Sequence, residues 1–452
     1  MDRIQKVFRN VEKHRALMLE AERHIWQHPE SGFKEWGTTA YLKEKYEALG
    51  YTLHMAGDIP GFYTDLDTGR PGPRVLVLGE MDSLIIPEHP EADPDTGCVH
   101  ACGHHCQSAA LLGLAAALKE PGALDGLCGT IRLMAVPAEE LVEVEFREDL
   151  RQKGVIGYYG GKQEFLRRGY MDGVDMAFMF HTSYGEGSFE LPNRGDNGCV
   201  FKTAEFFGKA AHAGANPHMG INALTAARLA MTAMDGLRES FKQSDYVRTH
   251  PILHFSGGAV NVTPARVLME NQVRAANMKA LMTQNSRVNR AVAAAAAAMG
   301  ATVKITDRAG YMPLINDPVL SELVIQAANL VDPDHPTVAG DEWSTGCTDL
   351  GDLSSLFPCV HPYAMGAVGP AHSATYTIAD PEKACVNSAK AQAVMLELLL
   401  ADDAAGAKRV LADYKPLYAD RETYLRDLDR FMLDLEGVTY TPDGTAILKY
   451  ED

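Results

Sequence analysis

One apolar segment constrains the fold of this chain more than any other feature. Ser108–Lys119 is apolar on almost every side, which is typical of a helix covered by a sheet and by neighbouring helices. It lies between two short apolar runs, Arg74–Leu78 and Thr130–Val136, that are typical of buried strands. Strand, helix and strand at this spacing predict an α/β domain whose functional loops lie at the carboxyl ends of the strands.

The pattern of the chain changes from about Cys199 onward. Strands and helices are expected in the order βαββαβ, which is typical of a ferredoxin-like unit. We therefore expect a catalytic domain formed by residues 1–197 and 311–452, with a mixed sheet flanked by helices, and an inserted domain at residues 198–310. The six expected elements of the inserted domain are Cys199–Gly208, Asn222–Leu237, Ile252–Phe255, Val267–Asn277, Arg287–Met299 and Thr302–Asp307.

Charge and composition exclude several classes of function. Lys and Arg number 42 against 60 Asp and Glu, so the chain carries a formal charge of −18, which repels nucleic-acid phosphates and anionic lipids. The segment Met1–Arg23 has charges every third or fourth residue and predicts an amphipathic helix, not a signal peptide. No segment has the roughly 18–20 consecutive apolar residues that a membrane span needs. We expect a cytoplasmic protein with no nucleic-acid or membrane partner.

A cluster of cysteines and histidines precedes the apolar helix, in the sequence His100-Ala-Cys-Gly-His-His-Cys106. Cys and His two positions apart cannot share one face of a helix, but they can converge on one ion at the turn that enters it. Gly103 would allow such a turn. The alternative is that these are loop residues without a ligand role.

A pair of carboxylates, Glu139 and Glu140, follows directly after the expected strand Thr130–Val136. At a strand end, one carboxylate can bind a metal ion while its neighbour reaches a metal-bound water, although a solvated loop is the alternative. His181 ends the apolar run Asp175–Phe180, where a strand tip would present it to the same face. Strand-end acids together with Cys and His match the ligand inventory of a hydrolytic metal site.

Taken in order along the chain, these motifs resemble the aminoacylase and carboxypeptidase family of two-metal peptidases. The resemblance is to its amidohydrolase branch, which includes indole-acetyl-amino-acid, hippurate and aminobenzoyl-glutamate hydrolases. It extends from about residue 20 to residue 400. The matching motifs are His28-Pro-Glu-Ser-Gly-Phe-Lys-Glu35, Met81-Asp82-Ser-Leu, His100-Ala-Cys-Gly-His104, Pro137-Ala-Glu-Glu140, His181, His212, Asn261-Val-Thr-Pro264 and His372.

The resemblance implies a zinc-peptidase-like catalytic domain, an inserted lid or dimerisation domain, a homodimer, and roles for individual residues. Glu139 would be the general base, and Asp82 would orient a metal ligand. His212 would stabilise the oxyanion, while Asn261 and Arg274 would grip a substrate carboxylate. For Arg274 the alternative is a surface strand position. Two divalent ions, zinc or manganese with cobalt and nickel as alternatives, would be bound by Cys102, His104, Glu140, His181 and His372.

The chain departs from the family pattern within the metal motif. His105 stands where the family usually has Asp or Asn, so we expect it to be an extra ligand, a donor behind the ligands or a substrate contact. The leading hypothesis is a metal-dependent amidohydrolase that cleaves N-acyl or N-aroyl amino acids or small dipeptides. The alternatives are a non-hydrolytic metal- or ligand-binding relative in which His105 displaces the water, and a zinc or iron–sulfur structural protein built on Cys98, Cys102 and Cys106.

Overall fold

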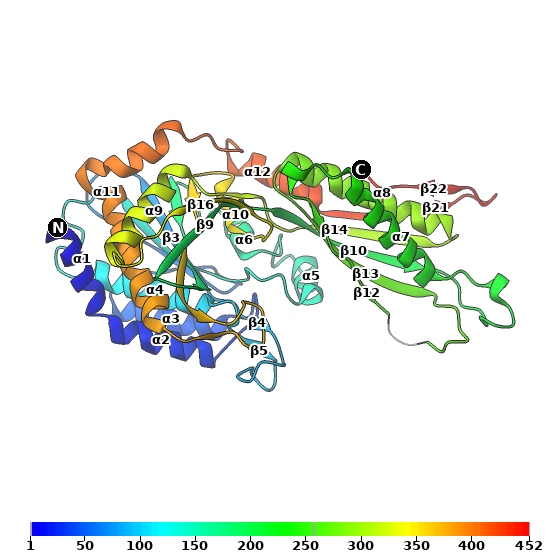
Figure 1. Cartoon of the computed structure of the whole chain (residues 1–452), viewed down its shortest axis with the longest axis horizontal. Helices are drawn as coiled ribbons and strands as arrows, with labels where there is room; N and C mark the ends of the chain where they lie inside the picture. The colour runs from blue at the N-terminus through cyan, green and yellow to red at the C-terminus, as the bar shows by residue number, and fades with distance from the viewer. Residues whose placement is uncertain (1, 256–257, 452) are drawn as a thin grey trace. The chain divides into compact units, whose positions relative to one another are not determined.

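The computed structural model describes residues 2–255 and 258–451 and divides the chain into two compact units (Figure 1). The first unit comprises Met1–Gly195, Ile315–Glu342 and Asp352–Arg421, and the second comprises Asp196–Leu314, Trp343–Gly351 and Glu422–Asp452. The longest segment of the second unit lies where the inserted domain is expected. The two shorter segments, Trp343–Gly351 and Glu422–Asp452, also belong to this unit, whereas the sequence pattern assigns them to the catalytic domain.

The first unit is built on a six-stranded mixed sheet. The two strands expected around the apolar helix are β3 (Arg74–Glu80) and β6 (Thr130–Val136), which are parallel neighbours. Each has one partly exposed residue followed by six buried ones, as expected for strands covered on both faces. The sheet has the order β1-β2-β6-β3-β7-β17, with the other strands at β1 (His54–Met55), β2 (Phe62–Asp67), β7 (Met176–Phe178) and β17 (Cys359–Val360).

Helix α4 (His104–Leu118) is the predicted apolar helix, and all of its residues are buried. It packs against β3 and against the helices α1 (Asp2–Glu12), α2 (Arg15–Gln27), α3 (Trp36–Ala48) and α11 (Ser388–Asp413). The helical stretch Glu382–Asp413 is long and apolar enough to cross a membrane by length and composition. However, 78% of its most apolar window is buried inside the protein, as in the core helix of a globular unit.

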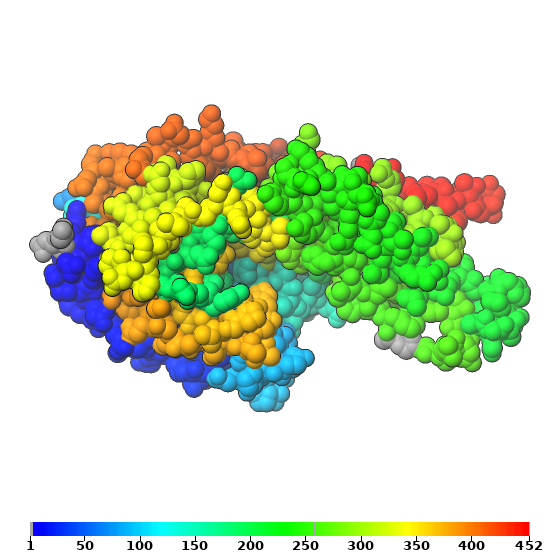
Figure 2. Space-filling model, in the orientation of Figure 1, coloured from blue at the N-terminus to red at the C-terminus, as the bar shows by residue number. Residues whose placement is uncertain are grey.

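A second sheet of the first unit carries the predicted strand-tip histidine. His181 is the first residue of β8 (His181–Tyr184), which pairs in parallel with β18 (Tyr363–Val368). The hairpin β4 (Leu84–Ile85) and β5 (Cys98–Val99) encloses an acidic loop, light blue in Figure 2, on the surface of this unit. The remaining elements are β9 (Phe189–Asp196), β15 (Leu314–Ile315), β16 (Ala339–Ser344), β19 (Thr377–Ile378), α5 (Val144–Gln152), α6 (Gly161–Arg167), α9 (Pro318–Val331) and α10 (Leu350–Ser354).

The second unit has the predicted βαββαβ order. Its strands form an antiparallel sheet with the spatial order β12-β13-β10-β14, which is the ferredoxin-like arrangement. A strand from the C-terminal segment, β20 (Leu433–Glu436), adds to the edge of β14. The elements are β10 (Gly198–Phe207), α7 (Ala223–Leu237), β11 (Arg248–Thr249), β12 (Ile252–His254), β13 (Arg266–Ala275), α8 (Met278–Ala298), β14 (Thr302–Ala309), α12 (Arg421–Leu428), β21 (Val438–Tyr440) and β22 (Ala446–Leu448).

Asparagine side chains fix where both long helices of the second unit begin. Asn222 Oδ1 accepts a hydrogen bond from Thr225 N at 3.1 Å, and Asn277 Oδ1 accepts one from Ala280 N at 2.9 Å. Each bond satisfies an amide that has no partner within the helix. Helix α8 therefore begins well before the expected start at Arg287, because the alanine-rich half is only its second part.

Candidate metal centre

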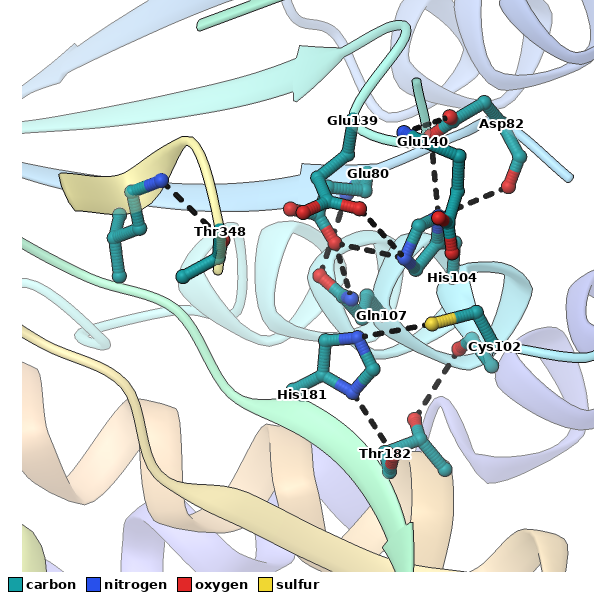
Figure 3. Close-up of polar contacts among 12 residues, drawn as sticks. Glu80, Asp82, Cys102, His104, Gln107, Glu139, Glu140, His181, Thr182 and Thr348 are labelled. Carbon is teal, nitrogen blue, oxygen red and sulfur yellow. Dashed lines mark hydrogen bonds and ion pairs between the residues drawn. The ribbon is translucent and has the colours of Figure 1, made fainter. Parts of the chain in front are cut away.

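Two parallel strands end side by side and bring several carboxylates together. β3 ends at Glu80, and Asp82 follows two residues later, while the turn Pro137–Glu140 follows β6. Because β3 and β6 are parallel neighbours, their carboxyl ends lie at the same edge of the sheet. Figure 3 shows the carboxylates of these two segments close to one another and to the imidazole of His104.

The turn before α4 depends on a glycine. Gly103 has φ = 90°, a conformation that L side chains rarely adopt. A Cβ atom at this position would lie 2.5 Å from Tyr376 Oη and 2.7 Å from Thr182 Cβ. The tight turn allows Cys102 and His104 to point the same way, with their ligand atoms within 4.8 Å of each other.

His104 is fully buried and is held in place by Asp82. Its Nδ1 lies 3.0 Å from the Asp82 carbonyl oxygen and 3.1 Å from Asp82 Oδ1, so Nδ1 carries the proton that it donates. Its Nε2 lies 3.1 Å from Glu80 Oε2 and 4.0 Å from Glu139 Oε2, and forms no hydrogen bond among the described residues. A buried imidazole nitrogen that faces carboxylates in this way fits a metal ligand, with Asp82 behind it.

The turn that carries the two glutamates is fixed by buried side chains. Ala138 has φ = 58°, and its amide donates to Glu35 Oε1 at 2.8 Å. The amide of Glu140 donates to Asp82 Oδ2 at 2.8 Å, and the Arg147 guanidinium donates to the Glu140 carbonyl oxygen. Glu35, Asp82 and Arg147 have no exposed surface. The backbone of the turn is therefore set before any ligand binds.

Two further histidines complete the cluster. His181 Nδ1 lies 2.9 Å from the Thr182 carbonyl oxygen and donates to it, which leaves Nε2 3.5 Å from Cys102 Sγ. Burial is the main cause that lowers the pKa of His181 to about 4, so the imidazole is neutral near pH 7, as a metal ligand must be. His372 Nε2 lies 3.0 Å from Glu140 Oε1.

The side chains able to bind a metal ion form two groups of three that share one sulfur atom. Within each group, one ligand atom per residue lies within 4.8 Å of the other two. Thiolate, imidazole and carboxylate together are a donor set for zinc and similar divalent ions. The structure thus brings together all five residues that the sequence suggests as ligands. The two groups are Cys102, His104, His181 and Cys102, Glu140, His372.

A buried ion pair beside this cluster is absent from the residues that the sequence indicates. Glu80 and Lys162 are both inaccessible to solvent, and the Lys162 ammonium donates to Glu80 Oε1 while Gln107 donates to Oε2 at 2.7 Å. Burial raises the pKa of Glu80, but the charges of Lys162 and then His104 outweigh it and lower the pKa, so Glu80 is ionised. Its place at a strand end is the signal that also marks Glu139, whereas nothing in the sequence marks Lys162.

His105 lies away from the predicted metal ligands. Its Nε2 is 3.3 Å from Glu22 Oε1, and its ring packs edge-on against Trp26 with ring centroids 5.0 Å apart. His104 and His105 are successive residues of α4, so their side chains project about 100° apart around the helix axis. The expectation that His105 is an extra ligand of the cluster or a substrate contact is not supported, because its ring faces α2.

The other predicted substrate-binding residues belong to the second unit. His212 forms an isolated β-bridge with the residue after Asn261, so these two residues lie on adjacent backbone segments. Arg274 lies on β13, where its guanidinium donates to Gln272 Oε1 at 2.7 Å and to the Thr345 carbonyl oxygen at 3.2 Å. Arg274 is half-buried, so the guanidinium is held in one place without being sealed from a ligand.

The fold and the cluster define a hydrolase of the α/β type with a site for divalent metal ions. The profile of the peptidase family M20/M25/M40 matches residues 76–398, and the chain belongs to this family. This confirms the resemblance drawn from the motifs. The protein is accordingly a hydrolase that acts on amide bonds.

Individual relatives agree with this assignment. N-acetyl-L-cysteine deacetylase of Bacillus subtilis (strain 168) is 28% identical over 340 residues, which cover 72% of this chain and 76% of that protein. Xaa-Arg dipeptidase of Mus musculus is 28% identical over 375 residues, 78% of each chain. A dinuclear metal-binding peptidase of the M20 family from Bacillus subtilis superposes with a TM-score of 0.64 at 21% identity, over 85% of this chain and 97% of that one. The structural likeness confirms the fold.

Proposed function

We propose that this chain hydrolyses the amide bond of N-acyl or N-aroyl amino acids, or of small dipeptides, with two divalent ions bound by the five predicted ligands. The observation that carries the proposal is the pair of three-residue groups that share Cys102 Sγ. Zinc or manganese fits this donor set, with cobalt or nickel as alternatives. The substrate class is supported by two relatives, N-acetyl-L-cysteine deacetylase and the p-aminobenzoyl-glutamate hydrolase of Escherichia coli (strain K12).

The proposed chemistry assigns one proton-transfer role to Glu139. A divalent pair, when bound, lowers the pKa of a water molecule and polarises the amide carbonyl. Glu139 lies beside the ligands, with Oε2 4.0 Å from His104 Nε2, and its carboxylate accepts the proton of the water and delivers it to the leaving nitrogen. Asp82 keeps His104 in the required tautomer through the bond to Nδ1.

Three residues of the second unit are proposed to bind the substrate. His212 Nδ1 accepts hydrogen bonds from the amides of Gly214 and Ala215 at 3.3 and 3.0 Å, so a neutral ring carries its proton on Nε2. That exposed Nε2–H is a suitable donor to an oxyanion. Asn261 and Arg274 are proposed to hold the free carboxylate of the substrate. We further propose a cytoplasmic homodimer formed through the second unit.

A non-hydrolytic relative is less compatible with the geometry. That alternative requires His105 to displace the reactive water, but the His105 ring faces Glu22 and Trp26 instead. The structural zinc or iron–sulfur alternative requires Cys98, Cys102 and Cys106 to converge, and no group of metal-capable side chains found among the described residues contains two of them.

The function is tested by incubating the protein with a pool of N-acyl amino acids, N-aroyl amino acids and dipeptides and following each by mass spectrometry. Metal-loaded protein is expected to deplete one class and release the matching acid and amine, because the bound ions activate the attacking water. The control is the same protein after chelation and removal of metal, which should leave the pool intact. Full metal occupancy without cleavage of any class would contradict the proposal.

Arg274→Ala is expected to raise KM for substrates with a free carboxylate about 10- to 100-fold, the cost of losing a charge-assisted hydrogen bond. KM for the corresponding carboxamides should not change, since they lack the negative charge. The matched control is Arg266→Ala, because Arg266 lies on the same strand but is exposed and pairs with Glu205. Equal KM values for carboxylate substrates in wild type and Arg274→Ala would remove Arg274 from its proposed role.

A further inference from the structure

A second group of metal-capable side chains lies between α2 and α4, outside the site described above. It consists of Glu22 from α2 and His105 and Cys106 from α4, and the two helices pack against each other (Figure 1). Glu22 Oε1 lies 3.3 Å from His105 Nε2, and Cys106 Sγ lies 3.4 Å from the same nitrogen. All three ligand atoms lie within 4.8 Å of one another. The group contains no ligand of the Cys102 cluster.

The spacing of these atoms matches the edges of a zinc coordination sphere. Zn–O and Zn–N bonds of about 2.1 Å and a Zn–S bond of about 2.3 Å place tetrahedral ligands about 3.4 Å apart for N and O and about 3.6 Å apart for N and S. The observed distances of 3.3 and 3.4 Å are within about 0.2 Å of these values, the tolerance expected of a metal site.

Burial gives a cation at this place a clear electrostatic role. Glu22 is 6% exposed, and His105 and Cys106 have no exposed surface. A carboxylate and a thiolate in such an environment need a compensating charge, since an isolated buried charge is strongly unfavourable. One divalent cation balances one carboxylate and one thiolate, and the neutral imidazole adds a ligand without adding charge. The Cys106 sulfur also shares a hydrogen bond with Cys385, which places a second thiol next to the group.

The geometry points to a third divalent cation, of the zinc type, bound by Glu22, His105 and Cys106 as a structural ion that ties α2 to α4. It goes beyond the proposed function, because it involves none of the residues assigned to hydrolysis. The direction of the side chains supports the separation: His104 faces the strand ends, and His105, the next residue of the helix, faces α2. The inference also explains why a histidine and a cysteine follow His104 in this chain, beside a buried glutamate.

The test is to locate the ions in crystals of the zinc-loaded protein by anomalous scattering recorded on both sides of the zinc absorption edge. We expect an anomalous peak within bonding distance of Glu22, His105 and Cys106, in addition to any peaks at Cys102. This measurement needs no variant and reads each site separately. An empty position between Glu22 and Cys106 overturns the inference whatever the state of the Cys102 cluster, while empty positions at Cys102 count against the proposed function alone.

Metal counting on purified protein provides a second, independent readout. Zinc per chain, measured by plasma mass spectrometry after desalting, is expected to fall by one equivalent in Glu22→Gln and in Cys106→Ala. The matched control is Cys98→Ala, which removes another buried cysteine that belongs to no metal-capable group and should leave the count unchanged. Wild-type zinc content in folded Glu22→Gln and Cys106→Ala proteins overturns the inference.

Discussion

Glu139→Gln is expected to lower kcat about 10²- to 10⁴-fold while the protein keeps its full metal content, because an amide cannot accept the proton of the attacking water. The substitution is nearly isosteric, and the Ala138–Glu140 turn remains fixed by Glu35, Asp82 and Arg147. Turnover is measured on the substrate class found in the pooled assay, and bound metal is counted in the same samples.

The matched control is the neighbouring substitution Glu140→Gln. Glu140 belongs to one of the two groups that share Cys102 and lies 3.0 Å from His372 Nε2, so this change is expected to lower metal content as well as turnover. The two adjacent glutamates are thereby separated into a proton acceptor and a ligand. If Glu139→Gln keeps more than about a tenth of wild-type turnover, which is less than the effect of losing a general base, the assignment fails.

Lys162→Met is expected to lower the free energy of unfolding by about 3–5 kcal/mol, because it leaves the ionised Glu80 carboxylate buried without its cationic partner. Both side chains of the pair are inaccessible to solvent, so water cannot replace the lost ammonium. The free energy is measured by urea denaturation after removal of metal, so that a change in metal affinity at the adjacent His104 does not contribute.

Two variants control this experiment. Lys153→Met removes a cation of similar size from an exposed pair with Asp149 and should change stability by less than about 1 kcal/mol. Lys162→Met combined with Glu80→Gln should recover most of the lost stability, since the uncompensated charge is gone. If the single variant Lys162→Met unfolds at the wild-type urea concentration, the buried pair does not carry the charges assigned to it.

The secondary structure of the first unit could be predicted where burial dominates the sequence. α4, β3 and β6 are buried almost throughout, so their apolar runs identified them. The prediction placed the start of α4 at Ser108 instead of His104, because the first turn carries polar side chains that hydropathy assigns to a loop. The pairing of β20 with β14 could not be predicted, since it joins segments more than a hundred residues apart and leaves no local pattern.

The candidate site was predictable in its residue types and less so in its geometry. Cys102, His104, Glu140, His181 and His372 come from separate segments, and their order along the chain carried the resemblance. The direction of His105 depends on its phase in α4, which the motif alone does not give. Lys162 was missed because a lysine beside two glycines suggests a solvated loop, and only the fold shows it buried against Glu80. The roles of His212, Asn261 and Arg274 stay predictions.

The added strand β20 has a consequence for self-association. Without Leu433–Glu436, β14 would be the outermost strand of its sheet, with a row of backbone donors and acceptors open to pairing with another chain. The C-terminal segment instead occupies these groups from within the same chain and leaves the opposite edge, at β11 and β12, as the side on which strand-to-strand contacts can form. A related hydrolase that lacks such a segment must protect the corresponding edge by other means, or use it to build a different assembly.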